Sequence, residues 1–294
     1  MGALVDLHVH SSKSSDGEYS PSEIIALARS ADLRAIAIAD HDTVAAYPEA
    51  LEAGEAEGME VIPSMEVTTV YDEREFHLLL PFLSWESTVV ADLEKEVSRR
   101  RFQEAAERVE KLKMLGFDIT WEEILSATAP LAPLGVTIAQ VLLQKTDRPA
   151  NKDLKKYLNG KEKLFAPYHF YKDFFMEGMP ACVPRRNIQL TDVLKIAPAT
   201  GGVPVLAHPG AYFQNTTRED IGVLKERGVR GLEVYTSYHN AEKTRFFKEI
   251  AEEFGLIATA GSDFHGAVKP HVKLGGLEHG EYEMVEALRK WRSQ

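Results

Sequence analysis

The chain has 294 residues, of which 44% are hydrophobic and 27% are charged, as is typical of a globular α/β domain that carries an insertion. The net charge of −11 argues against a broad binding surface for duplex nucleic acid. The single cysteine, Cys182, excludes an intrachain disulfide and a cysteine-rich zinc module. No run of 18 apolar residues predicts a membrane span and no basic leader precedes the first apolar run, so the expected compartment is the cytoplasm.

The first part of the chain alternates short apolar runs with helical patterns. A helix is predicted over 20–31, because Ser20, Pro21 and Glu23 form the pattern of a capping box, and a second helix follows Thr43. The third apolar run continues through two apolar arms around a polar centre, which predicts a hairpin. The predicted strands lie at 3–9, 34–40 and 59–67, with the hairpin centred on 72–74.

The pattern changes at about residue 87. Residues 87–189 are mostly helical and contain a long charged helix, so we interpret them as an insertion between the two parts of an α/β domain, 1–86 and 190–294. Strands return at 201–209, 230–236 and 255–265. About seven buried strands separated by helices favour a parallel barrel. An open doubly wound sheet is the alternative, but no glycine-rich phosphate-binding turn follows the first strand.

Polar residues gather where these strands end. His8 and His10 stand at alternate positions, so both can point to one side of the first strand. Active sites of α/β barrels are built at the carboxyl ends of the strands, and neutral imidazole is the commonest metal ligand. The pattern therefore predicts a metal cluster with nine candidate ligands: His8, His10, Asp40, His41, Glu66, His77, His208, Asp263 and His265.

The donor set indicates the kind of metal. Imidazole and carboxylate without thiolate suit Zn, Mn or Fe, with Mg as a further candidate. Nine ligands exceed the four that one tetrahedral zinc ion uses, so two or three divalent ions are expected, and Glu66 is the candidate bridging carboxylate.

The motifs DLHVHS, SSDG, ADHDT, PSMEVTT, FHLLL, LAHPG and GSDFHG resemble, in this order, those of the PHP superfamily, named for polymerase and histidinol phosphatase. The resemblance covers 1–85 and 190–294, and it is strongest to the nucleoside 3′,5′-bisphosphate phosphatases, nucleotide phosphatases and short-RNA exonucleases. It implies a distorted (β/α)7 barrel with a trinuclear site. The implied ligand sets are His8, His10, Glu66 and Asp263; Glu66, His77 and His208; and Asp16, His41 and His265.

The resemblance also implies roles in catalysis. A phosphomonoester would be hydrolysed by hydroxide that the metal ions generate. Asp40 would orient its neighbours, and His239 is the candidate proton donor or phosphate contact. The insertion would act as a lid. Arg185, Arg186 and Lys269 are candidate anion contacts, although solvated surface charge is the alternative for each.

One departure concerns the insertion. Nucleotide-specific relatives carry a Gly-Arg-Pro-His-like turn there, whereas this chain has PLGVTIAQ, which keeps Gly135 but lacks the Arg and His. The resemblance implies a small nucleotide-like substrate, and the acidic chain, which offers no basic groove, favours it over RNA. The alternatives are a 5′–3′ exonuclease on short RNA, a histidinol-phosphate phosphatase, and a metal-holding regulatory domain. The complete ligand set disfavours the regulatory domain, because a site without turnover would be expected to have lost at least one ligand.

Overall fold

The computed structural model describes residues 4–14, 16–159, 163, 165–184, 186–214 and 216–293. It divides into two compact units. The sheet unit comprises Met1–Lys95 and Asn187–Gln294, and the helical unit comprises Glu96–Arg186. Helix α3 (Thr88–Met114) crosses the division between them. The role of 87–189 as a lid stays a prediction.

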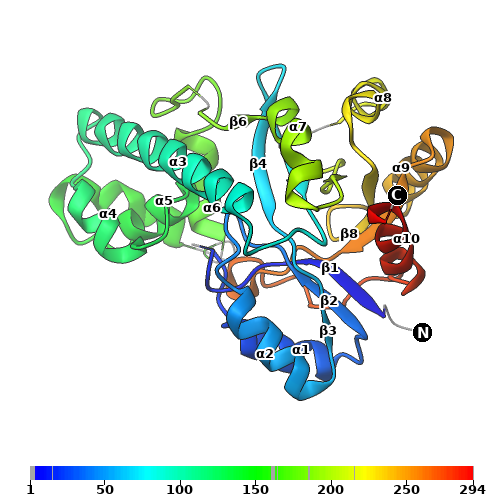
Figure 1. The fold of residues 1–294 in the computed structure, drawn as a ribbon. Helices are drawn as coiled ribbons and strands as arrows, with labels where there is room; N and C mark the ends of the chain where they lie inside the picture. Colours follow the sequence, from blue (N-terminus) through cyan, green and yellow to red (C-terminus); the bar gives the residue numbers. More distant parts are fainter. Residues whose placement is uncertain are drawn as a thin grey trace. The chain divides into compact units, whose positions relative to one another are not determined.

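Two β-sheets make up the centre of the sheet unit (Figure 1). The smaller sheet is parallel, in the order β1-β2-β3, and the larger is mixed, in the order β6-β4-β5-β7-β8-β9. The α/β class is therefore confirmed. The strands are β1 Val5–Val9, β2 Ala35–Ile38, β3 Glu60–Val61, β4 Glu66–Tyr71, β5 Arg74–Leu79, β6 Ile188–Gln189, β7 Val205–Leu206, β8 Gly231–Thr236 and β9 Ile257–Gly261.

The predicted hairpin is confirmed. Strands β4 and β5 pair antiparallel, and Thr68 stands opposite His77. Asp72 and Glu73 form the turn, with φ values of 50° and 59°. Two positive φ values in a two-residue loop match the right-handed twist of the flanking strands.

One prediction about the strands is wrong. The expected continuous strand over 59–67 is broken, since β3 ends at Val61 and β4 begins at Glu66. Pro63 lies in the break and has no N–H for a strand ladder. The larger sheet is mixed because β5, the returning arm of the predicted hairpin, is antiparallel to both β4 and β7. Strand β6 has no counterpart in the predicted pattern.

Isolated parallel bridges join the two sheets. Val9 pairs with Phe264, just beyond β9, and His41, just beyond β2, pairs with Glu66 at the start of β4. The residues that follow β1, β2 and β9 are thereby drawn to one place. Closure into a seven-stranded barrel stays a prediction.

Helices flank the strands of the sheet unit. Helix α1 begins as predicted, because the Ser20 side chain caps it and Glu23 completes the capping box. Helices α1 and α2 lie side by side and pack on the smaller sheet through an apolar cluster that includes Ile24, Ile36 and Ile38 (Figure 1). The helices are α1 Pro21–Ser30, α2 Tyr47–Glu57, α7 Leu190–Thr200, α8 Arg218–Arg227, α9 Ala241–Phe254, η3 Gly266–Val268 and α10 Glu283–Arg292.

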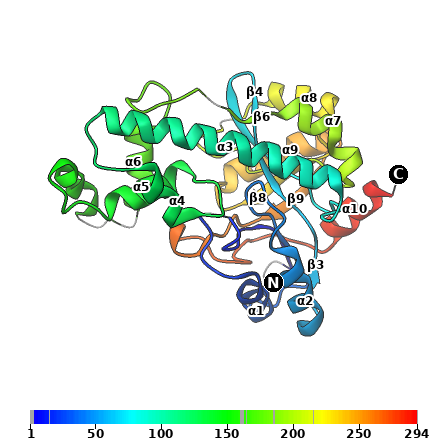
Figure 2. The ribbon, with the colours of Figure 1, turned by 60° about the vertical axis from the view of Figure 1, so that its left-hand side comes forward.

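The helical unit has its own apolar core. The later part of α3 packs with the shorter helices through Val109, Ile124, Ile138 and Phe170 (Figure 2). These shorter helices are α4 Trp121–Thr128, α5 Gly135–Leu143, η1 Pro149–Leu158 and α6 Ala166–Phe174. Within the described residues, no helix combines the length and apolar character needed to cross a lipid bilayer.

Candidate metal centre

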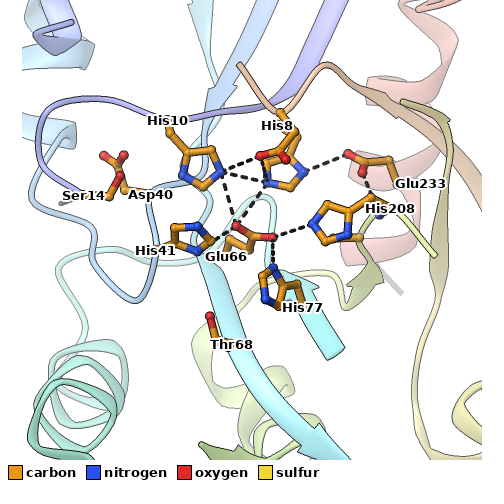
Figure 3. A network of polar contacts seen from close by, with 12 residues as sticks. His8, His10, Ser14, Asp40, His41, Glu66, Thr68, His77, His208 and Glu233 are labelled. Atoms are coloured by element: carbon orange, nitrogen blue, oxygen red, sulfur yellow. Dashed lines mark hydrogen bonds and ion pairs between the residues drawn. The ribbon is translucent and has the colours of Figure 1, made fainter. Parts of the chain in front are cut away.

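Strand ends deliver most of the predicted ligands. His8 lies in β1 and His10 follows it, and His41 and His208 follow β2 and β7. Figure 3 shows the carboxylate of Glu66 among these imidazoles, with His8, His10 and His41 on one side and His77 and His208 on the other.

Backbone hydrogen bonds fix the ligand-bearing segments to one another. The N–H of Asp263 donates to the carbonyl of His8 at 2.8 Å, and the N–H of His10 donates to that of Phe264 at 2.9 Å. His208 and Asp263 have φ values of 26° and 58°. Non-glycine residues in this region are strained, and such strain clusters at functional sites.

The first group of ligand atoms comes from His8, His10, Glu66 and Asp263, all buried. The Nε2 atoms of His8 and His10 are 3.1 Å apart, and each is 3.3 Å from Glu66 Oε2. Asp263 Oδ1 is 3.5 Å from the first nitrogen and 3.0 Å from the second. Ligands at about 2.0–2.2 Å from a tetrahedral zinc ion are separated by roughly 3.3–3.6 Å. The spacing of this group therefore suits one divalent ion.

The second group surrounds the other oxygen of Glu66. Its Oε1 is 2.7 Å from His77 Nδ1 and 3.0 Å from His208 Nε2. His77 reaches this position across the hairpin, and His41 Nδ1 lies 2.9 Å from Glu66 Oε2. One carboxylate thus contacts five imidazoles from four segments of the chain.

The third group is built around Asp16. Its Oδ2 is 3.4 Å from His265 Nε2 and 3.6 Å from His41 Nε2, and His10 also belongs to this group. His41 therefore faces two groups, with Nδ1 toward Glu66 and Nε2 toward Asp16. The structure thus brings all nine residues of the three implied ligand sets together.

Asp40 organises the loop that carries Asp16. Its two oxygens accept from the backbone N–H and the hydroxyl of Ser11, both at 2.6 Å. Ser14 then donates to Asp16 Oδ1 at 3.1 Å. A side chain at Gly17 would begin 2.0 Å from the carbonyl oxygen of Ser11, so this tight return requires glycine. Asp40 thus acts on the 11–17 loop, and its role in orienting neighbouring ligands stays a prediction.

The cluster is strongly polarised. Burial by itself raises the pKa of Glu66, but the charges of His41, His77 and His8 outweigh it and hold that pKa well below the usual range. Burial lowers the pKa of an imidazole, yet nearby carboxylates raise that of His10 to about 9 and that of His77 to about 10. Without a metal ion, the carboxylates therefore keep His10 and His77 protonated, which indicates that this site favours positive charge.

The residues fit divalent ions. Among the described residues, Glu66 Oε2 and His41 Nδ1 form no hydrogen bond although they are 2.9 Å apart. At 3.1 Å, the Nε2 atoms of His8 and His10 can share one proton, or both can turn their lone pairs to one cation. A cation would also give Glu66 Oε2 a partner, and the imidazole–carboxylate set matches borderline and hard divalent metals.

Residues 6–174 match the model of the PHP domain family. The chain belongs to the PHP family. It is 28% identical over 263 residues to a 5′–3′ exoribonuclease of Haemophilus influenzae, and the alignment covers 88% of this chain and 89% of that protein. It is 26% identical over 295 residues to a 3′,5′-nucleoside bisphosphate phosphatase of Chromobacterium violaceum, which covers 99% and 96%.

A solved PHP-like structure agrees with these relatives. A protein of Bifidobacterium adolescentis assigned as a metal-dependent phosphoesterase superposes with a TM-score of 0.79 at 26% identity, over 97% of this chain and 94% of that one. The predicted family is thereby confirmed, and this PHP chain is a metal-dependent phosphoric-ester hydrolase.

The predicted proton donor of the PHP site has both ring nitrogens engaged. His239 Nε2 accepts from the N–H of Gly210 at 3.0 Å, and Nδ1 lies 2.8 Å from the carbonyl oxygen of Val234. Burial lowers the pKa of His239 to about 4. In this arrangement the ring is neutral and Nε2 carries no proton, so its donor role stays a prediction.

The predicted anion contacts occupy different surroundings. Lys269 is half-buried; its ammonium donates to the Tyr238 hydroxyl at 2.8 Å and pairs with Asp263. Arg186 is exposed in the helical unit and pairs with Glu107. Arg185 lies outside the described residues.

The turn that departs from the nucleotide-specific PHP pattern begins α5 as expected. Thr137 Oγ1 is occupied at 2.8 Å by the backbone of Leu134. A Cβ on Gly135 would lie 2.7 Å from Arg108 Nη1, so a guanidinium from α3 stands beside this turn, where it pairs with Glu104 at 2.6 Å. Sequence patterns do not reveal this cation, since it approaches from another helix.

Sequence reasoning missed two buried acids beside the PHP site, one that contacts a candidate ligand and one that bonds only the main chain. Glu233 in β8 lies 3.0 Å from His8 Nδ1, and Asp6 in β1 accepts from the backbone N–H of Ser262 at 2.8 Å. Each is the only acid in a buried strand, a signal that could have identified both.

Proposed function

We propose that this chain hydrolyses the phosphomonoester of a small nucleotide-like substrate with two to three divalent metal ions. The observation that carries the proposal is the position of Glu66. Its carboxylate touches imidazoles of three ligand groups, and such a junction suits ions that share one phosphoryl group.

The proposed ligands follow these groups. One ion would use His8, His10, Glu66 and Asp263; a second would use Glu66, His77 and His208; a third would use Asp16, His41 and His265. The imidazole–carboxylate set suits Zn, Mn or Fe, with Mg as a further candidate. When bound, the ions neutralise phosphoryl oxygens and supply a hydroxide nucleophile near neutral pH.

Protein side chains would position the substrate and manage protons. Hydroxide forms a bond to phosphorus while the ester P–O bond breaks, and the leaving alkoxide takes up a proton. We propose that the Lys269 ammonium contacts the phosphate, because it already pairs with Asp263 at the edge of the first group. For His239 to act as the candidate proton donor, its bond from Gly210 must be released and Nε2 must take up a proton from solvent.

Aromatic rings beside the second group support a nucleotide over a simple phosphate. The Phe213 ring is 5.4 Å from the rings of both His77 and His208, and Tyr238 is 5.2 Å from that of His208. Aromatic rings can stack on any of the nucleobases, because every base has a π-face. The named activities of the relatives, on nucleoside bisphosphates and on RNA, point to the same substrate class.

The test is phosphate release from a panel of substrates. It contains nucleoside monophosphates, 3′,5′-bisphosphates, ribose 5-phosphate as a base-free comparator, histidinol phosphate and short RNAs, each with Mn and with Zn. We expect turnover of nucleotides and slower turnover of ribose 5-phosphate. Stepwise release of mononucleotides from the RNA 5′ end without phosphatase activity would overturn the proposal and identify an exonuclease. Selective cleavage of histidinol phosphate would also overturn it.

We further infer that the strands close into a distorted (β/α)7 barrel. The bridges Val9–Phe264 and His41–Glu66 support closure, because they join the smaller sheet to both β9 and β4. In such a barrel the ligand groups would lie at one end of the strands.

A further inference from the structure

Glu233 is a buried acid that none of the three ligand groups contains. It lies in β8, and its side chain is fully enclosed. Its Oε1 is 3.0 Å from Nδ1 of His8, and its Oε2 accepts from the backbone N–H of His208 at 2.7 Å (Figure 3). One carboxylate therefore reaches residues of both the first and the second group.

The contact with His8 decides which ring nitrogen is free. A carboxylate at Nδ1 accepts a hydrogen bond only if Nδ1 carries a proton, and in the neutral ring that can bind a metal this leaves the lone pair on Nε2. That Nε2 lies 3.1 Å from His10 Nε2 and 3.3 Å from Glu66 Oε2. The other tautomer would place a hydrogen at the point where these atoms converge. Carboxylates that bond the distal nitrogen of a ligating histidine orient it in this way.

The contact with His208 holds a strained backbone. His208 has a φ of 26°, which is unfavourable for a side chain with a Cβ. Its N–H donates to Glu233 while its Nε2 points to Glu66 Oε1 at 3.0 Å. Loss of the acceptor would leave a buried N–H without this bond and allow the ring to move away from Glu66.

Neighbouring residues make room for this arrangement. A Cβ on Gly261 of β9 would lie 2.2 Å from Glu233 Oε1 and 2.3 Å from His8 Cβ. The pairing of β8 with β9 also shifts register between Glu233 and Tyr235. Irregularities of this kind re-aim a side chain.

Asp6 provides the comparison with a purely structural acid. It is equally buried, on the strand that carries His8. It accepts from the backbone N–H groups of Ser262 at 2.8 Å, Gly275 at 2.9 Å and His8 at 3.4 Å, all of them in the main chain. Asp6 therefore ties segments together, whereas Glu233 bonds the imidazole of a candidate ligand.

We propose that Glu233 is a positioning residue that fixes His8 with its proton on Nδ1 and holds His208 against Glu66, and so couples the first and second metal groups. This inference rests on the proposed function only in taking His8 and His208 as ligands. It does not depend on which ester is cleaved.

The first experiment compares Glu233→Gln with Asp6→Asn. Glutamine keeps the shape but has one acceptor oxygen, so it can satisfy His8 or His208 and not both. Zinc and manganese affinities are measured by chelator competition, with melting temperatures on the same samples. We expect Glu233→Gln to weaken metal binding about 10- to 100-fold. Asp6→Asn should lower the melting temperature with metal affinity within about threefold of wild type.

The second experiment reads the protonation of His8 directly. Nitrogen-15 NMR of histidines in the zinc-loaded protein, with His8 assigned by its absence in His8→Gln, reports which nitrogen carries the proton. We expect Nδ1–H, and the signal should shift in Glu233→Gln. Protonated Nε2, or unchanged metal affinity in Glu233→Gln, would overturn the inference. If wild type binds no metal at all, the proposed function fails instead.

Discussion

Glu66→Gln tests the shared carboxylate most directly. The substitution removes one negative charge and replaces one oxygen with an amide nitrogen, whose hydrogens cannot ligate a metal or accept from an imidazole. The affected contacts are short, 2.7 Å to His77 Nδ1 and 2.9 Å to His41 Nδ1. A cation shared by these imidazoles would lie within a few ångströms of the lost charge.

The size of the effect follows from this separation. Opposite unit charges about 4 Å apart attract by about 4 kcal/mol at an effective dielectric constant of about 20. Since about 1.4 kcal/mol corresponds to a factor of ten, metal affinity should fall by about 10³-fold or more. A divalent ion strengthens the attraction. We expect a fall in kcat/KM of several orders of magnitude.

The assay combines metal content, kcat/KM and melting temperature on one sample. Asp220→Asn is the matched control. Asp220 lies in α8 and pairs with Arg74, which is on the same hairpin as Glu66, and Asp220 belongs to no ligand group. It should retain metal and turnover. Near-native turnover and metal content in Glu66→Gln would refute the bridging role. Lower stability with normal turnover of the folded fraction would identify Glu66 as a structural, hydrogen-bonded acid.

Four further outcomes are expected. Elemental analysis should find two to three equivalents of transition metal per chain, and one equivalent or less after reconstitution would contradict three metal groups. Asp16→Asn should lower that number by about one, whereas unchanged occupancy would leave Asp16 as a turn residue. In the metal-free protein, the pKa is raised to about 9 for His10 and to about 10 for His77. Protonation of these rings therefore stabilises the fold. This stabilisation is complete below the pKa of about 6.5 that histidine has in the unfolded chain, and it is lost as the pH rises through 9 to 10. Its melting temperature should therefore fall between pH 7 and 10, and a constant value in calorimetry would argue against the ion pairs. Because the turn before α5 offers no cation of its own, kcat/KM should show little preference for a 3′,5′-bisphosphate over the monophosphate. Val136→Arg should raise the preference about ten- to a hundredfold through one charge-assisted hydrogen bond, but a hundredfold preference in wild type would show that another cation, such as Arg108, already acts there.

Eight of the nine candidate ligands were predictable because each lies in or beside a strand visible in the apolar pattern, whereas Asp16 lies in the loop before α1 and was indicated only by the family resemblance. His8 and His10 share a side of β1 by the period of a strand, and their nitrogens meet at 3.1 Å. The double engagement of His41 was not predictable, since ring orientation depends on the packing of Glu66 and Asp16 around it. Glu233 is visible in the sequence as the lone acid of β8, but its contact with His8 was hidden, since the direction of its side chain depends on a register shift between β8 and β9.

The strand topology was only partly visible. The turn residues of the β4–β5 hairpin have a local signature, and the hairpin was found. The pairing of β5 with β7 joins segments more than a hundred residues apart in the chain, and no local pattern specifies its antiparallel direction. Likewise, the approach of Arg108 to Gly135 is a contact between helices that only tertiary packing determines.

The joining of β1 to the segment after β9 has a consequence for synthesis. His8 and His10 emerge from the ribosome early, but Asp263, which bonds to the His8 carbonyl, emerges more than two hundred residues later. During that interval one edge of β1 lacks its final partner, and unpaired edges invite association with other chains. A nascent chain therefore cannot complete the first ligand group until translation has passed Asp263, and we expect products truncated before that residue to aggregate.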